Sequence, residues 1–187
     1  MKKLFIHIPK TAGSSVLTVI GKNKNFVCKL HYDILRLNIQ CVPEYKKMFS
    51  FCIVRDPYER IVSAYNFLKQ KKTNINHMEK SYKEILSKYS SFADCIKDLE
   101  TLQYKIVHFV PQHKFVCSEQ GEILVNSVIR MENLSELEHI DPLFSNLPHT
   151  NKSCNDDFVL TNDMKKIIYH LYKQDFDIFQ YSANLEE

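Results

Sequence analysis

The first 21 residues constrain the fold more than any other segment of this chain. Leu4 to Ile8 is a short apolar run that stops at a proline, the pattern of a buried β-strand. After a short loop, Val16 to Ile20 is an apolar stretch preceded by two serines and closed by Gly21, which is typical of a capped helix. A strand, a tight loop and a helix in this order open a parallel α/β unit. We therefore expect a three-layer α/β fold that resembles P-loop proteins, with a central parallel sheet flanked by helices.

The rest of the chain carries weaker element signals. Phe49 to Val54 is a second buried-strand candidate, and Asp56, Pro57 and Glu59 after it form a capping-box pattern that predicts a helix start. Helices are expected over 92–107 and 163–176, a strand over 123–131 and a loop over 141–157. The polar segment 70–90 is expected to be either a mobile excursion or a substrate-facing loop with some helix. With no repeat or linker, the chain is expected to be a single domain over residues 1–187.

Charge and cysteine content exclude several classes of protein. A formal net charge of +3 is too small to indicate nucleic acid as a partner, but it suits anionic small molecules. The six cysteines form no CxxC pair, so no metal site is expected, and those in apolar runs suggest reduced, buried thiols of a cytosolic protein. His7 and Lys10 interrupt the apolar start, so no signal peptide is expected, and no stretch has the length of a membrane span. A cytoplasmic location follows as the expectation.

The loop after the first strand has the composition of a phosphate-binding site. A loop that leads from a strand into a helix presents backbone N–H groups and the positive end of the helix dipole. Gly13 allows the backbone to approach a ligand closely, and Lys10 adds a positive charge. Hydroxyl donors are supplied by Thr11, Ser14 and Ser15. The alternative interpretation is a plain strand–turn–helix connection with a capping serine.

The position of Lys10 separates this loop from the Walker A loop of kinases and ATPases. In that motif a lysine directly follows a glycine, whereas here Lys10 precedes Gly13 by three positions. A lysine early in the loop is expected to lie near the bond that breaks and to neutralise charge on the leaving phosphate. A P-loop nucleotide kinase, which would require ATP and Mg²⁺, is therefore the less favoured function.

The segment Ile8-Pro9-Lys10-Thr11-Ala12-Gly13-Ser14-Ser15 resembles the 5′-phosphosulfate loop of the sulfotransferase superfamily. Within it, the likeness is to the carbohydrate branch that contains heparan sulfate 2-O-sulfotransferase and the chondroitin and dermatan enzymes. The cosubstrate of that family is 3′-phosphoadenosine 5′-phosphosulfate (PAPS). The resemblance implies a sulfotransferase with no metal, whose acceptor is a hydroxyl on a carbohydrate. It also implies cosubstrate contacts from Lys10, Thr11, Ala12, Gly13, Ser14 and Ser15.

A second motif, Ile53-Val54-Arg55-Asp56-Pro57 and onward to Tyr65, is similar to the family's 3′-phosphate motif. In that motif an arginine at a strand end and a serine eight positions later hold the ribose 3′-phosphate, and Arg55 and Ser63 occupy those positions. A guanidinium offers a planar fork of donors to a phosphate, and Ser63 would lie about two turns into the next helix. The alternatives are an ion pair of Arg55 with Asp56 or Glu59 and a small residue at position 63 packed against the sheet.

The general base is expected to be His31. A histidine near neutral pKa suits removal of a proton from an acceptor hydroxyl. His31 resembles the catalytic histidine that the 2-O-sulfotransferase branch carries in a His-Gly-His sequence, although Lys29 stands here in place of the first histidine. If His31 is not the base, then Glu59, His108 or another group must take that role.

Weaker resemblances extend along the chain. Phe109-Val110-Pro111-Gln112 is similar to a Pro-Gln segment of the family, an acceptor-side or structural element, and 128–134 is similar to a later strand that ends in Glu-Asn-Leu. Asn151 and Ser153 belong to an Asn-x-Ser sequence that resembles a loop near the cosubstrate, which implies further contacts there. A non-catalytic protein of the same fold that binds PAPS or another nucleotide is the remaining alternative.

Overall fold

The computed structural model describes residues 1–30, 44–70, 77–148 and 159–185 of the chain. Its internal contacts divide the chain into two compact units. Unit 1 comprises Met1–Arg55 and Gln112–Lys152, and unit 2 comprises Asp56–Pro111 and Ser153–Glu187. Each unit has a hydrophobic core of its own and is described by itself.

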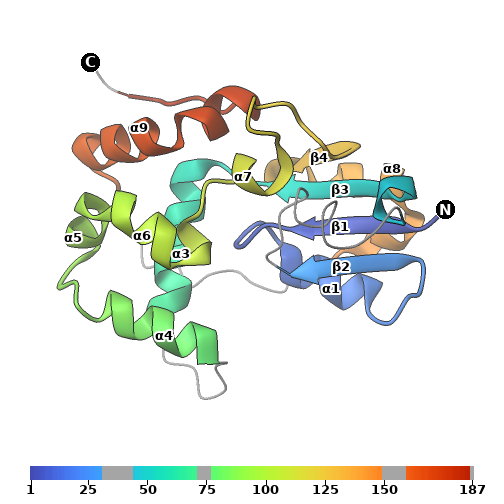
Figure 1. The fold of residues 1–187 in the computed structure, drawn as a ribbon, viewed down its shortest axis with the longest axis horizontal. Coiled ribbons are helices and arrows are strands. Elements are labelled where there is room, and N and C mark those ends of the chain that lie inside the picture. The colour runs from blue at the N-terminus through green and yellow to red at the C-terminus, as the bar shows by residue number, and fades with distance from the viewer. Residues whose placement is uncertain (31–43, 71–76, 149–158, 186–187) are drawn as a thin grey trace. The chain divides into compact units, whose positions relative to one another are not determined.

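Unit 1 is built on a parallel sheet of four strands in its described residues (Figure 1). The strands lie in the order β2-β1-β3-β4. All three neighbouring pairs are parallel, with Lys3 opposite both Phe26 and Phe49, and Val54 opposite Arg130. The carboxyl ends of the strands therefore meet at one edge of the sheet. The strand bounds are β1 Lys3–His7, β2 Phe26–Leu30, β3 Phe49–Val54 and β4 Ser127–Arg130.

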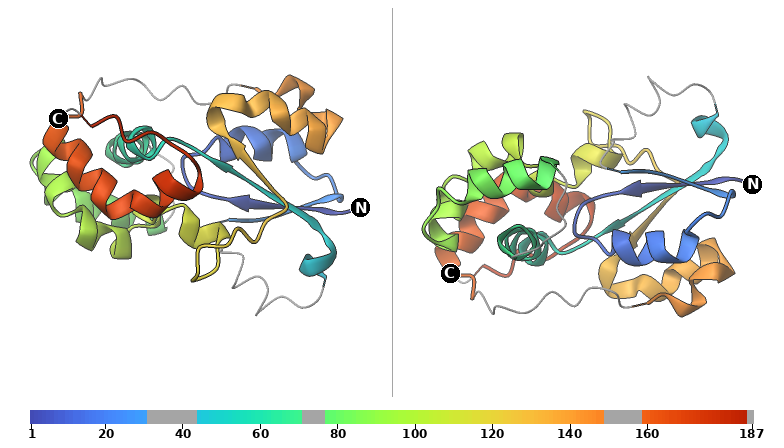
Figure 2. Two further views of the ribbon diagram at one scale, coloured as in Figure 1. Left: turned by 90° about the horizontal axis from the view of Figure 1, so that it is seen from above. Right: turned by 90° about the horizontal axis from the view of Figure 1, so that it is seen from below.

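One face of this sheet is covered by α1 (Gly13–Ile20), α8 (Leu137–Ile140) and the 3₁₀ helix η4 (Pro142–Asn146), as Figure 2 shows. Alternate strand positions such as Phe5 and Phe51 form the core with these helices. In the two central strands, β1 and β3, the intervening positions Leu4, Ile6, Cys52 and Val54 are buried as well, as expected for a parallel sheet within an α/β fold. The expected α/β architecture, a central parallel sheet flanked by helices, is therefore confirmed. Unit 1 also contains η1 (Tyr45–Lys47), α7 (His113–Val116) and η3 (Met131–Glu136).

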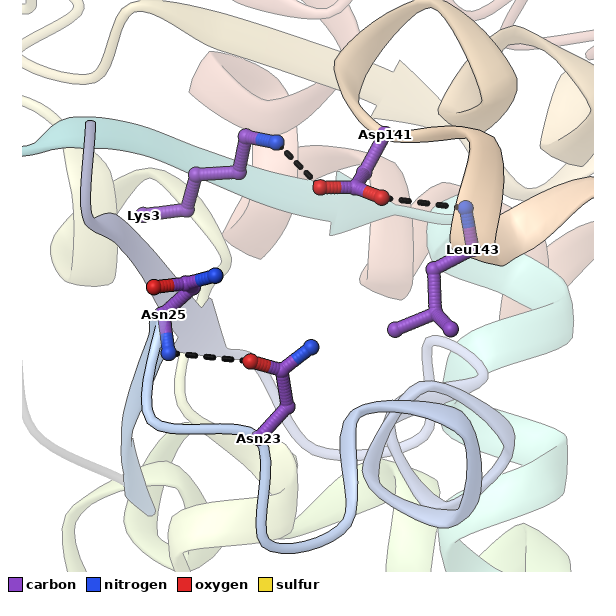
Figure 3. Close-up of polar contacts among 5 residues, drawn as sticks. All are labelled: Lys3, Asn23, Asn25, Asp141 and Leu143. Carbon is purple, nitrogen blue, oxygen red and sulfur yellow. Dashed lines mark hydrogen bonds and ion pairs between the residues drawn. The ribbon is translucent and has the colours of Figure 1, made fainter.

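A polar cluster ties the amino end of the sheet to η4 (Figure 3). The Lys3 ammonium donates to the Asp141 carboxylate, whose other oxygen accepts a hydrogen bond from the Leu143 N–H at 3.0 Å. These two hydrogen bonds hold the pKa of Asp141 below its usual range, and the bond from the Lys3 ammonium has the larger effect. In the turn before β2, the Asn23 side chain accepts from the Asn25 N–H at 3.0 Å. Because Lys3 begins β1, this cluster stabilises the edge of the sheet opposite the carboxyl ends of the strands.

Unit 2 is helical in its described residues. The expected start of α3 is confirmed, because the Asp56 carboxylate accepts a hydrogen bond from the Glu59 N–H at 3.1 Å and Pro57 is the first helical residue. The core of the unit joins α3 to α9 and to the helices between them. The helices are α3 Pro57–Lys69, α4 His77–Leu86, α5 Phe92–Lys97, α6 Leu99–Lys105, η2 Val107–Phe109 and α9 Asn162–Ile178. None of the described helices is both long and apolar enough to cross a membrane.

Several expected boundaries need correction. The helix expected over 92–107 is interrupted at Asp98, and the strand expected over 123–131 is reduced to β4, with Ile123 in an isolated antiparallel bridge to Cys117. The expected loop over 141–157 contains η4, and 149–158 lie outside the described residues. The segment 70–90 contains α4, in agreement with the helix expected in part of it, and residues 71–76 lie outside the described residues. Strand β2 was not foreseen.

The buried thiols agree with the interpretation of the cysteines as core residues. Cys52, Cys95 and Cys117 are buried, and Cys28 is partly exposed. Burial raises the pKa of Cys28 to about 11 and, as the main cause, that of Cys95 to about 12. Because the thiolate is the reactive form, the raised pKa lowers the reactivity of these two side chains at neutral pH.

Candidate active site

The loop after β1 has an unusual backbone. Lys10 and Ala12 are non-glycine residues with positive φ, 71° and 61°, on either side of Thr11. Such conformations cost on the order of 1–3 kcal/mol each and persist where the surroundings impose them. Thr11 supplies part of that constraint, since it is fully buried and its hydroxyl donates to the Ile8 carbonyl at 2.9 Å. The loop is thus held in one shape that a relaxed turn would not adopt.

This loop leads directly to the amino end of α1. The residue before the helix is Ala12, so the expectation of a capping serine is wrong, and Ser14 and Ser15 lie in the first turn instead. The Ala12 carbonyl accepts the first hydrogen bonds, from the Ser15 N–H at 3.0 Å and the Val16 N–H at 3.2 Å. No side chain caps this end among the described residues. The leading amides and the dipole of the helix therefore point toward the loop, where an anion would be stabilised. The expected end of the helix is confirmed at Gly21, which has φ 45°.

Gly13 is required by packing as well as by any ligand. A Cβ atom at this position would lie 1.9 Å from Nε2 of His7 and 2.0 Å from its Cδ2. The His7 ring stacks on Phe5, with 5.9 Å between ring centroids, so it is held in place. Sequence reasoning gave close ligand approach as the role of Gly13. The structure adds a second role, which is to let the end of β1 touch the start of α1.

The backbone of Arg55 is held by one buried side chain. The Arg55 N–H donates to Oε1 of Gln112 at 2.9 Å, and the Gln112 Nε2 donates back to the Arg55 carbonyl at 2.9 Å. Gln112 is fully buried. The sequence predicts that the Pro-Gln segment is either an acceptor-side or a structural element, and these contacts give Gln112 a structural role beside Arg55.

Positively charged residues at the carboxyl edge of the unit 1 sheet include Lys10, Arg55 and Arg130. Lys10 is in the loop that follows β1, Arg55 follows β3 directly, and Arg130 is the last residue of β4, opposite Val54. Arg130 is partly buried, and sequence reasoning did not select it as a site residue. The available signal was a charged residue at the end of an apolar strand. Ligands of open α/β sheets bind at this edge.

The other residues selected from the sequence lie elsewhere. Ser63 is a buried residue of α3 in unit 2, so Arg55 and Ser63 belong to different units. His31, Asn151 and Ser153 lie outside the described residues.

The two alternative bases differ in exposure. Glu59 is exposed in the first turn of α3. His108 is only 5% exposed, and its ring stacks on Phe67 at 5.3 Å and meets Tyr82 edge-on at 5.8 Å. Such packing is typical of a core histidine and disfavours His108 as a base.

The fold and this edge define a class: α/β proteins with a parallel sheet and a rigid loop that precedes the first helix and is suited to bind an anion. Within that class, the chain matches the sulfotransferase family over residues 2–182 and belongs to that family. Its general activity is accordingly the transfer of a sulfuryl group. No curated protein sequence and no solved structure matches the chain.

Proposed function

We propose that this chain is a PAPS-dependent sulfotransferase that moves the sulfuryl group to a hydroxyl on a carbohydrate. The observation that carries the proposal is the loop over residues 8–15, which holds Lys10 and the amino end of α1 at the carboxyl edge of a parallel sheet. The family match runs through both units, which supports a single functional domain over residues 1–187.

The hydrogen-bond donors of this loop are suited to the 5′-phosphosulfate of PAPS. The 5′-phosphosulfate is bound by backbone amides at the start of α1 and by the Lys10 ammonium. Because the Thr11 hydroxyl already donates to Ile8, Thr11 contributes its backbone N–H. The remaining contacts to the 5′-phosphosulfate come from Ala12, Gly13, Ser14 and Ser15. The 3′-phosphate is bound by Arg55 and Ser63, and Asn151 and Ser153 complete the cosubstrate site.

The reaction is a single in-line displacement at sulfur. His31 accepts the proton of the acceptor hydroxyl as its oxygen forms the new bond to sulfur. The bond between sulfur and the bridging phosphate oxygen breaks, and adenosine 3′,5′-bisphosphate leaves with the electron pair of that bond. Lys10 stabilises the negative charge that develops on this oxygen. Positioning and electrostatic stabilisation supply the rate enhancement.

Binding of nucleotides tests the proposal directly. Adenosine 3′,5′-bisphosphate is expected to raise the thermal unfolding temperature more than adenosine 5′-monophosphate does at the same concentration. A ligand at 100 times its Kd stabilises the folded state by about 2.7 kcal/mol. ATP with Mg²⁺ is the third arm of the experiment. Stabilisation by ATP and Mg²⁺ but not by the bisphosphate would sink the proposal in favour of a kinase.

Turnover is tested with labelled PAPS against a panel of glycans, lipid-linked sugars and small alcohols. Transfer to a sugar hydroxyl is the expected result. Binding of the bisphosphate without transfer to any member of the panel would favour the non-catalytic alternative.

His31→Ala is expected to lower kcat by about 100-fold, the low end of the effect of a general base. The affinity for adenosine 3′,5′-bisphosphate should be unchanged, because the base contacts the acceptor and not the nucleotide. The measurement is kcat with labelled PAPS, together with the Kd of the bisphosphate. His139→Ala, at an exposed position in α8, serves as the matched control. Wild-type turnover in His31→Ala would transfer the role to Glu59 or another group.

A further inference from the structure

The ladder between β3 and β4 ends one residue before Arg55. In the register of β3 and β4, Val54 is opposite Arg130, and both strands end at this pair. Arg55 is the next residue, so the ladder to β4 does not reach its peptide groups. Its N–H and C=O both bond to the carboxamide of Gln112, each at 2.9 Å. Gln112 therefore extends the hydrogen bonding of the sheet by one residue.

A glutamine is specifically suited to this task. Its side-chain amide carries an acceptor and a donor side by side, which match the N–H and C=O of one residue. An ionised glutamate offers no donor, and an asparagine is one methylene shorter. Gln112 is itself fully buried, so its rotamer is fixed by the residues around it. The backbone at Arg55, and with it the direction of the Cα–Cβ bond, is set by this pair of hydrogen bonds.

We infer that Gln112 is a positioning residue that aims Arg55 at the 3′-phosphate and so determines the preference for 3′-phosphorylated adenosine nucleotides. The inference rests on the proposed function, in which Arg55 binds that phosphate. In this role Gln112 acts through the Arg55 backbone, to which its carboxamide is hydrogen-bonded. Its effect is thus on the selectivity between nucleotides with and without the 3′-phosphate.

The test is the ratio of two dissociation constants, for adenosine 5′-monophosphate and for adenosine 3′,5′-bisphosphate, measured by calorimetry. Gln112→Met keeps the length and apolar volume of the side chain but removes both hydrogen bonds. We expect the ratio to fall by about tenfold to a hundredfold, the scale of effect of a misplacement near 1 Å. The Kd of the monophosphate should stay near the wild-type value, which a general loss of structure would not allow. Gln112→Asn, which keeps both polar groups but is shorter, should lower the ratio in the same direction.

Two reference variants separate the possible failures. Arg55→Ala should abolish the preference, and Gln103→Met, at another buried glutamine, on α6, should leave the ratio unchanged. A wild-type protein with no preference for the bisphosphate would remove the 3′-phosphate site from the proposed function, and the inference with it. A wild-type preference that Arg55→Ala abolishes but folded Gln112→Met retains would overturn the inference alone. If neither Gln112 variant folds, Gln112 is a folding determinant and the positioning role is rejected.

Discussion

Replacement of Lys10 by alanine is expected to lower kcat by about 10²–10³-fold, the effect of removing one preorganised donor to a developing negative charge. The ammonium is needed most as the bridging oxygen gains charge, so the loss should fall on kcat more than on the Kd of adenosine 3′,5′-bisphosphate. The fold should survive, because Lys10 is only partly buried and lies in a loop. The measurement is steady-state transfer from labelled PAPS, with circular dichroism as the check on folding.

The positive φ of Lys10 determines which control variants are needed for this substitution. Because Lys10 has φ 71°, alanine at this position bears the same conformational strain as lysine, whereas glycine would release it. Lys10→Gly should therefore lose turnover like Lys10→Ala while it unfolds at a temperature no lower than Lys10→Ala. Lys22→Ala, at an exposed position just after α1, is the matched control and should retain turnover. Wild-type turnover in Lys10→Ala would remove Lys10 from the mechanism.

The elements that sequence reasoning predicted are those with complete local signals. The range of β3 agrees with the structure residue for residue, because an apolar run bounded by a polar helix start leaves little freedom. The start of α3 is also right, since Asp56 and Pro57 satisfy the requirements of a helix N-terminus without help from distant residues. The position of Gly21 likewise marks the end of α1.

The details of the candidate site depend on contacts that no local pattern encodes. The positive φ values at Lys10 and Ala12 are imposed by tertiary structure, so the loop was expected to use a serine cap that it does not use. The contact between His7 and Gly13 joins two elements across the loop. The Gln112–Arg55 pair spans 57 positions in the sequence, which spacing alone cannot reveal. The roles of Lys10, His31, Arg55 and Ser63 remain predictions.

The second large effect is expected on stability, at Arg60 in unit 2. Its side chain is fully buried, and its guanidinium donates to the carbonyls of His108, at 3.2 Å, and Val110. Between them, the Phe109 carbonyl accepts a hydrogen bond from the hydroxyl of Tyr172. Burial raises the pKa of this hydroxyl, which therefore keeps its proton and remains a donor. Two side chains thus act as donors to three successive carbonyls, at the end of η2 and directly after it.

Arg60→Met is expected to lower the free energy of unfolding by about 2–5 kcal/mol, because it leaves two carbonyls without their donor, and the bond to His108 is buried. Arg60→Lys should be intermediate, since one ammonium cannot reproduce the fork of donors. The measurement is urea unfolding followed by far-ultraviolet circular dichroism, which suits a chain without tryptophan.

An exposed ion pair on α9 provides the control for the Arg60 substitution. Lys173 and Asp177 on α9 lie 2.6 Å apart and are both exposed, so Lys173→Ala should change the free energy of unfolding much less than Arg60→Met does. Both substitutions remove one positive charge, and they differ chiefly in burial. If Arg60→Met and Lys173→Ala cost the same, the carbonyls of the 108–110 segment do not depend on Arg60. A large difference would assign the stability of this segment to the buried guanidinium rather than to charge alone.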